Sequence, residues 1–193
     1  MRIVGGRHRG RRIAAPDGRA VRPTSDRARE AVFNLIENGR ALREAGFVLA
    51  GAIVLDAFCG TGALGLEALS RGAGAVTFLD ADRDALSAAR DNAETLGEAG
   101  QCAFLRGDAA APPPAPAAHT LAFLDPPYAK DLVVPALAGL AEKGWLADGA
   151  LCVVERGADE APLDLPEAFA ILDARRYGAA AIDFIRYAGL PGQ

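Results

Sequence analysis

In one stretch of this chain a strand, a glycine-rich loop and a helix follow one another closely. The apolar run 52–55 ends at Asp56, and glycines at 60, 62 and 65 lead into a helical pattern. Glycines at this spacing permit a tight turn, and the first N–H groups of the helix can face the polar atoms of a ligand. The stretch predicts an α/β fold with a nucleotide-like ligand, and taken alone it suggests a dinucleotide.

Strands and helices alternate along the rest of the chain, which predicts a mainly parallel sheet covered on both faces. The helix of 83–96 has Asp82 as its expected cap and Gly97 as its end. The last two strands leave no room for a helix between them and should form an antiparallel hairpin across Tyr177–Gly178. We expect 109–118 to be a surface loop. The predicted strands are 52–56, 75–80, 102–105, 120–125, 150–155, 169–174 and 181–187, and the helices are 62–70, 83–96, 131–143 and one starting at Ser25 or Asp26.

Four acidic residues stand at or just past the ends of successive predicted strands: Asp56, Asp80, Asp108 and Asp125. Parallel strands all end at the same edge of a sheet, and ligands of such sheets bind beyond that edge. A single acid at a strand end is commonly a helix cap. Four in register predict a shared site.

The positions of three of these acids bear on the ligand. Asp80 lies 20 residues after Gly60, where an acid hydrogen-bonds the ribose hydroxyls of a bound nucleoside. Asp108 can reach the amino group of an adenine. NAD and S-adenosylmethionine share both features. Asp56 separates them, because a carboxylate before the glycines repels a pyrophosphate but stabilises the ammonium group of a methionine.

The fourth predicted strand runs into Asp125-Pro126-Pro127-Tyr128, and this motif points to chemistry on an aromatic amine. Such an amine is a poor nucleophile, since its lone pair is delocalised into the ring. A carboxylate and a fixed backbone carbonyl that accept its hydrogens favour tetrahedral nitrogen and stabilise the developing positive charge. The prolines hold the carbonyl rigid, and Tyr128 offers a flat face on which a flipped-out base can stack.

Charge divides the chain into a basic arm and an acidic body. Residues 1–30 carry nine arginines and three acids, whereas the remainder carries 12 basic and 22 acidic residues. This asymmetry suggests that the arm holds a polyanionic partner. We therefore expect two parts, the arm 1–24 and a domain of 25–193. Neither a membrane span nor a secretory signal is expected, which favours the cytoplasm. Cys59, Cys102 and Cys152 have no metal-like spacing and are expected to be reduced and buried.

Three further stretches narrow the interpretation: Arg22–Glu30 with Phe33–Asn34, Gly65–Ala73, and Leu124–Tyr128. Together with Asp56–Gly65 they resemble the RsmD family of class I S-adenosylmethionine-dependent methyltransferases. The resemblance runs from about Arg2 to Tyr187. It implies a Rossmann-like fold with a seven-stranded sheet, no metal, and methyl transfer to N2 of a guanine in 16S ribosomal RNA (guanine-966 type). The substrate would be a small-subunit particle and the enzyme a monomer.

The resemblance also implies roles for single residues. Asp125, Pro126 and Tyr128 would be catalytic, and Tyr128 would also contact the base. The cofactor contacts would be Thr24, Asp56, Gly60, Gly62, Asp80 and Asp108, with Asp82 as a possible substitute for Asp80 at the ribose. The RNA contacts would be Arg7, Arg9, Arg11, Arg12, Arg22 and Arg27.

Other functions stay open at this point. An adenine-N6 DNA methyltransferase uses the same motif, but it usually carries a target-recognition domain for which 193 residues leave no room. Cytosine-C5 chemistry needs a Pro-Cys pair, which is absent. An NAD-dependent oxidoreductase leaves Asp125–Tyr128 unexplained. A non-catalytic RNA-binding assembly factor is a further alternative, disfavoured by the intact motif. We assign neither His8 nor His119 to catalysis.

Overall fold

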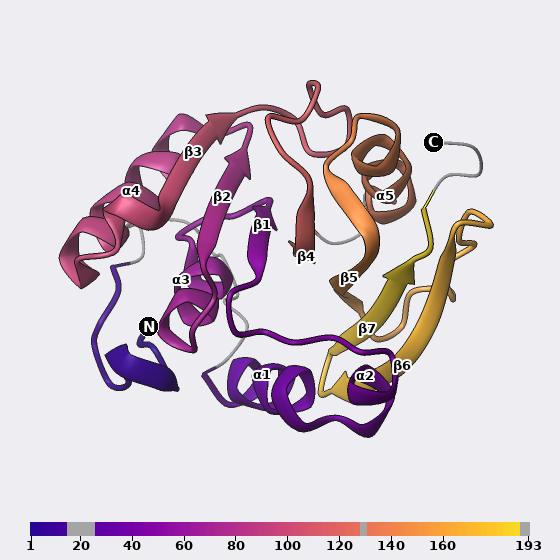
Figure 1. Cartoon of the computed structure of the whole chain (residues 1–193), viewed down its shortest axis with the longest axis horizontal. Coiled ribbons are helices and arrows are strands. Elements are labelled where there is room, and N and C mark those ends of the chain that lie inside the picture. Colours follow the sequence, from indigo (N-terminus) through magenta and orange to yellow (C-terminus); the bar gives the residue numbers. More distant parts are fainter. Residues whose placement is uncertain (15–25, 128–130, 190–193) are drawn as a thin grey trace.

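The computed structural model describes residues 1–14, 26–127 and 131–189, which are built around one sheet (Figure 1). The seven strands have the order β3-β2-β1-β4-β5-β7-β6. β1 to β5 pair in parallel, and β7 pairs antiparallel with both β5 and β6. This confirms the mostly parallel sheet with an antiparallel C-terminal hairpin. The strands are β1 (Ile53–Ala57), β2 (Ala75–Asp80), β3 (Cys102–Arg106), β4 (His119–Leu124), β5 (Leu146–Gly157), β6 (Phe169–Tyr177) and β7 (Ala180–Tyr187).

The helices follow the predicted pattern, and a few short elements are added to it. Asp82 accepts a hydrogen bond from the N–H of Asp84 at 2.8 Å and so caps α4, while Gly97 ends that helix in a left-handed conformation. Both features were predicted from the sequence. The second short helix, α2, and the N-terminal 3-10 turn were not. The helices are α1 (Asp26–Asn38), α2 (Arg40–Glu44), α3 (Ala63–Ser70), α4 (Arg83–Leu96) and α5 (Val133–Glu142), with 3-10 turns η1 (Gly6–His8) and η2 (Ala99–Gln101).

Two apolar cores lie on opposite faces of the sheet. The larger joins α1, α3 and α4 to strand residues such as Phe78, Phe123 and Val153. The other joins α5 to alternate strand residues such as Leu124 and Val154. Because side chains of a strand alternate between faces, neighbours in β4 and β5 serve different cores. The site therefore lies beyond a sheet that is held rigidly on both sides.

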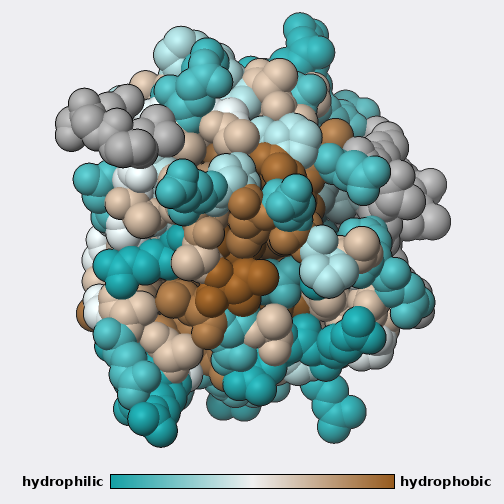
Figure 2. Space-filling model, turned by 90° about the vertical axis from the view of Figure 1, so that its right-hand side faces the viewer, coloured by the Kyte–Doolittle hydropathy of each residue, from teal (hydrophilic) through white to brown (hydrophobic). Residues whose placement is uncertain are grey.

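β6 is the exposed edge strand of the sheet, and some of its side chains are charged. Arg175 and Arg176 of β6 are exposed, and charged side chains on an edge strand oppose pairing with another chain. Ile171 is about half exposed. Figure 2 shows apolar side chains gathered in the middle of the face on this side of the molecule, with hydrophilic ones around them.

The loop 109–118 contains no helix or strand, as predicted apart from a turn at its start. Its Pro113 carbonyl accepts a hydrogen bond from the indole N–H of buried Trp145 at 2.7 Å. His119 is also buried, and its ring nitrogens lie 3.0 Å from the Trp145 carbonyl and 3.0 Å from Thr77 Oγ1. Burial lowers the pKa of His119, so this residue is a neutral core group far from the ligand edge.

Candidate functional site

The loop between β1 and α3 turns sharply through left-handed backbone. Phe58, Gly60 and Gly62 have φ values of 58°, 51° and 75°, a region that glycine enters without steric cost. At Gly65 the reason for glycine is packing, because an added Cβ would lie 2.6 Å from the Phe78 ring. The predicted glycine spacing thus gives a tight turn and a close approach of α3 to β2.

Asp56 is buried at the end of β1, where it holds the start of α3. Its Oδ2 accepts a hydrogen bond of 2.8 Å from the backbone N–H of Gly65, one of the amides that lack a partner within the helix. Burial raises the pKa of Asp56 well above its ordinary value, and the charges of Asp125 and Asp80 raise it further. The Gly65 bond opposes this shift only in part.

Asp80 connects the glycine loop to the next turn of the chain. Its Oδ2 accepts from the Gly60 N–H at 3.0 Å and its Oδ1 from the Asp82 N–H at 2.9 Å. Each carboxylate oxygen has a second lone pair, so Asp80 can still accept hydroxyl donors. Asp82 instead caps α4. Asp108 is exposed past the end of β3, where it accepts from the Ala110 N–H at 2.9 Å.

Asp125 follows the last residue of β4, beside the acidic residue Glu155 of β5. Leu124 pairs with Val154, so Asp125 and Glu155 are the next residues along two neighbouring parallel strands. Glu155 is buried. Burial and the charge of Glu155 together raise the pKa of Asp125 to about 7. Pro126, directly after Asp125, is also buried.

Glu155 is a site residue that was not predicted from the sequence, although the same signal identifies it. It is an acid that follows an apolar run, Leu151–Val154, two residues before the end of β5 at Gly157. The rule applied to Asp56, Asp80, Asp108 and Asp125 therefore applies to a fifth acid.

The acidic edge has a definite chemical preference. The carboxylates of Asp56, Asp80 and Asp125 are close enough for the charges of the latter two to raise the pKa of Asp56. A cationic ligand would relieve this repulsion, whereas a pyrophosphate would add to it. The donor set therefore fits an ammonium or sulfonium group, and it does not fit a dinucleotide.

The N-terminal segment 1–14 packs against the body of the protein. Arg2 and Arg12 form an antiparallel bridge, and Ile3 and Ile13 are buried in the larger core. Residues 1–14 thus form a hairpin-like loop. Asn92 of α4 fixes its end, accepting from the Ala14 N–H at 2.8 Å and donating to the Ala14 and Thr61 carbonyls at 3.0 Å.

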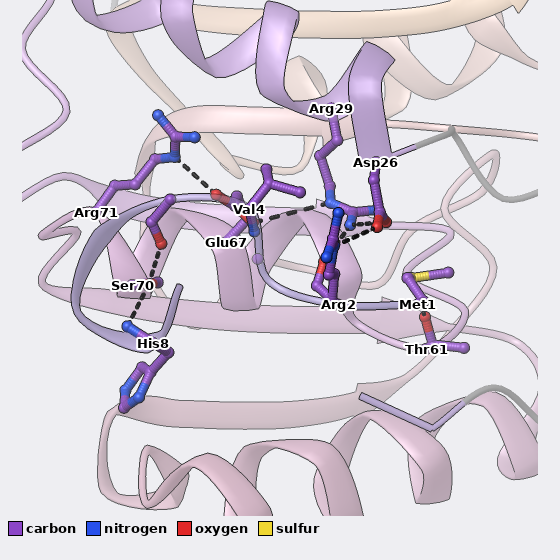
Figure 3. A network of polar contacts seen from close by, with 12 residues as sticks. Met1, Arg2, Val4, His8, Asp26, Arg29, Thr61, Glu67, Ser70 and Arg71 are labelled. Carbon is purple, nitrogen blue, oxygen red and sulfur yellow. Dashed lines mark hydrogen bonds and ion pairs between the residues drawn. The ribbon is translucent and has the colours of Figure 1, made fainter. Parts of the chain in front are cut away.

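Buried charges hold the same segment on α3 (Figure 3). Glu67 accepts from the Val4 N–H at 2.8 Å and from Arg71 Nε at 2.7 Å, and Arg29 Nε lies 3.8 Å from it. Arg29 also donates to Asp26 Oδ1 at 2.8 Å. Glu67 and Arg29 are almost completely buried. The arrangement ties the segment, α1 and α3 into one unit.

The arginines of the predicted RNA-binding set fall into two groups. Arg7 donates to Glu98 at 2.7 and 2.6 Å, and Arg11 donates to the Thr95 carbonyl at 2.5 Å, so both contact the body. Arg9, Arg12 and Arg27 are exposed. Arg9 and Arg27 line one hollow of about 380 Å³, together with Arg2 and two acidic residues, Asp26 and Glu30.

Three predicted site residues, Thr24, Arg22 and Tyr128, lie outside the described residues, as does the boundary drawn after residue 24. In the described ranges there is no group of side chains suited to a metal ion. None of the helices in these ranges is long and apolar enough to cross a membrane.

Comparison with known proteins gives the chain a family. The profile of a family described as Conserved hypothetical protein 95 matches residues 1–186. The ribosomal RNA small subunit methyltransferase D of Escherichia coli is 39% identical over 158 residues, which cover 80% of this chain and 74% of that protein. The chain belongs to the RsmD family.

Two further comparisons extend the likeness over nearly the whole chain. The ribosomal RNA small subunit methyltransferase D of Haemophilus influenzae is 34% identical, with 92% of this chain and 89% of that protein covered. A solved structure titled as a putative methyltransferase yhhF from Escherichia coli superposes with a TM-score of 0.83 at 32% identity, covering 98% and 99% of the two chains. The class I methyltransferase fold is thereby established.

Proposed function

We propose that this protein transfers a methyl group from S-adenosylmethionine to the exocyclic N2 of a guanine in 16S ribosomal RNA, of the guanine-966 type. The names of its RsmD relatives support an RNA of the small ribosomal subunit as substrate. The observation that carries the proposal is the acidic edge, where Asp56, Asp80 and Asp125 meet at the glycine loop and continue into the Asp125–Tyr128 motif.

The described residues fit the cofactor in charge and in hydrogen bonding. When bound, S-adenosylmethionine supplies an electrophilic methyl group on a positively charged sulfur. Asp56 would stabilise the ammonium group, Asp80 would accept the ribose hydroxyls, and Asp108 the adenine amino group. Gly60 and Gly62 would keep the loop free of side chains beside the ligand, and Thr24 would contact the methionine carboxylate.

Asp125 and Pro126 would act on the guanine. The Asp125 carboxylate and the Pro126 carbonyl each accept one N2–H, which moves the nitrogen toward tetrahedral geometry and exposes its lone pair. The lone pair would form the new bond to the methyl carbon as the methyl–sulfur bond breaks and its electron pair goes to sulfur, and the nitrogen would then give up one proton. Asp125, with a pKa of about 7, is suited to receive that proton. Tyr128 would stack on the flipped-out base.

The arginine-rich end of the chain would hold the RNA. Arg9, Arg12 and Arg27 would meet phosphates directly, together with Arg22. Arg7 and Arg11 would contribute charge while they anchor the segment. We propose that the protein works as a monomer in the cytoplasm. Its substrate would be a partly assembled small subunit, in which the folded RNA holds the target base in a defined position.

The proposal is tested by supplying the purified protein with methyl-labelled cofactor and three acceptors. These are small subunits that lack the modification, free small-subunit RNA, and duplex DNA. Label in the RNA of the small subunit is the expected result. Label in DNA alone would favour the adenine-N6 alternative, and binding of RNA without any label would favour the non-catalytic assembly factor.

A further inference from the structure

Glu155 stands next to the catalytic motif but has no part in the chemistry described so far. Since Leu124 pairs with Val154 in parallel, the residues that follow, Asp125 and Glu155, meet at the same edge. Phe123 and Val153 both face the larger core, and strand side chains alternate. In that alternation Glu155 falls on the same face as Val153, and the Asp125 position continues the face of Phe123.

A cavity of about 190 Å³ opens beside this pair. Pro126 and Pro127 of the motif form one side, Leu132 and Val133 at the start of α5 another, and Glu155 is part of its wall. Two sides of the cavity are therefore apolar, which suits the two faces of a flat base. The buried carboxylate of Glu155 lies where the cavity meets the edge of the sheet. The other charged residues of the wall are Asp131, Arg156, Glu160 and Asp164.

The one basic residue among the described residues of this wall has its own acidic partner. Arg156 Nε donates to Asp183 Oδ2 at 2.7 Å, and the same guanidinium donates to the Glu160 carbonyl at 3.1 Å. Both Arg156 and Asp183 are largely buried. The cavity is therefore acidic at Glu155, so it fits a ligand edge that presents hydrogen-bond donors.

We propose that Glu155 accepts the N1–H of the target guanine and thereby selects guanine over purines that lack an N1–H. The inference rests on the proposed function. Asp125 and the Pro126 carbonyl use both hydrogens of N2, so the neighbouring N1–H needs a separate acceptor on the same edge of the base. Adenine and 2-aminopurine carry a lone pair at N1. That lone pair would face the Glu155 carboxylate and leave the contact unmade.

The electrostatics of the free protein agree with such a role. Two adjacent carboxylates repel each other, and the charge of Glu155 adds to burial in raising the pKa of Asp125 to about 7. Two parallel N–H donors of guanine, one to each carboxylate, would relieve the repulsion. Asp56 is the other acid near Asp125, on the side of the glycine loop.

The test compares guanine with 2-aminopurine at the methylated position of a reconstituted small subunit. 2-Aminopurine keeps the reacting amine but lacks the N1–H. We expect the wild type to prefer guanine by roughly tenfold to a hundredfold in kcat/KM. In Glu155→Gln the amide can donate to the N1 lone pair, so the preference should shrink to a few-fold. An unchanged preference in this variant would overturn the proposal.

The pH dependence gives a second readout that a purely structural role of Glu155 would not move. Removal of the Glu155 charge should lower the pKa of Asp125 and shift the rise of kcat/KM to lower pH in Glu155→Gln. Glu142→Gln, the same change at an exposed residue of α5, serves as the control with unaltered preference and profile. A variant profile that coincides with that of the wild type would contradict the proposal. If the wild type methylates no guanine at all, the proposed function fails instead.

Discussion

The surroundings of Asp125 change its pKa, and this change bears directly on its proposed role in catalysis. Its pKa of about 7 results from burial first and from the charge of Glu155 second. Only the ionised carboxylate can take up the proton that the base nitrogen gives up. We therefore expect kcat/KM to rise with pH through about 7 and to level off above it. The measurement is a pH–rate profile at saturating cofactor, and a flat profile from about pH 6 to 9 would contradict this role.

Replacing Asp125 by Asn should lower turnover and raise stability. The amide introduced by Asp125→Asn cannot receive a proton, so turnover should fall about a hundredfold or more while cofactor affinity is kept. The folded-state pKa is raised above the ordinary 3.8, so the folded protein holds a proton that the unfolded chain has released. Stability thus falls as pH rises from about 4 to about 7. The variant should lack that decline and be more stable by roughly 1–3 kcal/mol at pH 8, as measured by urea unfolding. Equal losses of affinity and turnover would show that the role is misassigned.

Asp56 should affect cofactor binding, where Asp125 affects turnover. Asn can still accept the hydrogen bond from the Gly65 N–H but carries no buried charge. We expect Asp56→Asn to weaken S-adenosylmethionine binding by roughly tenfold or more and to raise the free energy of unfolding at neutral pH. Calorimetric titration measures the affinity. Asp84→Asn, a change at an exposed residue of α4, is the control, and equal affinities of the two variants would refute the ammonium contact.

At the scale of residues, local sequence predicted the carboxylates but not their environment. The positions of Asp56, Asp80 and Asp125 follow from strand ends and spacing. The pairing of Asp125 with Glu155 depends on which strand lies next to β4, and no local pattern encodes that order. Likewise, the engagement of both Asp80 oxygens by backbone N–H groups follows from the turn geometry of the assembled loop.

Among the elements, those with strong local signals were predicted best. α4 has the predicted bounds because Asp82 caps it and Gly97 ends it. β5 is longer than predicted and begins at Leu146, since Asp148 and Gly149 interrupt the apolar pattern of its first residues. The docking of segment 1–14 could not be predicted, because its partners Glu67, Asn92 and Glu98 lie on distant parts of the chain.

The buried charges under this segment lead to a prediction at the same scale. Glu67 is fully buried and accepts from Val4 and Arg71. Its replacement by Ala leaves buried cationic groups without that partner. We expect Glu67→Ala to lower the free energy of unfolding by roughly 3 kcal/mol. Glu44→Ala, which breaks an exposed pair with Arg40, should cost at most about 0.5 kcal/mol. Equal effects in urea unfolding would show that the network does not anchor the segment.

For the whole molecule, the separation of charge governs how it meets RNA. Residues 1–30 are rich in arginine, whereas the rest of the chain is rich in acidic residues. A polyanion is therefore attracted to residues 1–30 and repelled by the rest of the chain. We expect RNA affinity to fall steeply with salt, and Arg9→Ala with Arg27→Ala to reduce the slope of log K against log salt by about 2. Filter binding over a salt series measures this. An affinity independent of salt would contradict the proposed interface.

The proposed function is tested most directly by identifying the atom of the RNA that is methylated. Small subunits lacking the modification are incubated with the protein and S-adenosylmethionine, and the RNA is digested to nucleosides for mass spectrometry. We expect one N2-methylguanosine per particle, formed by the wild type and not by Asp125→Asn. N6-methyladenosine, or N2-methylguanosine formed equally by the variant, would contradict it.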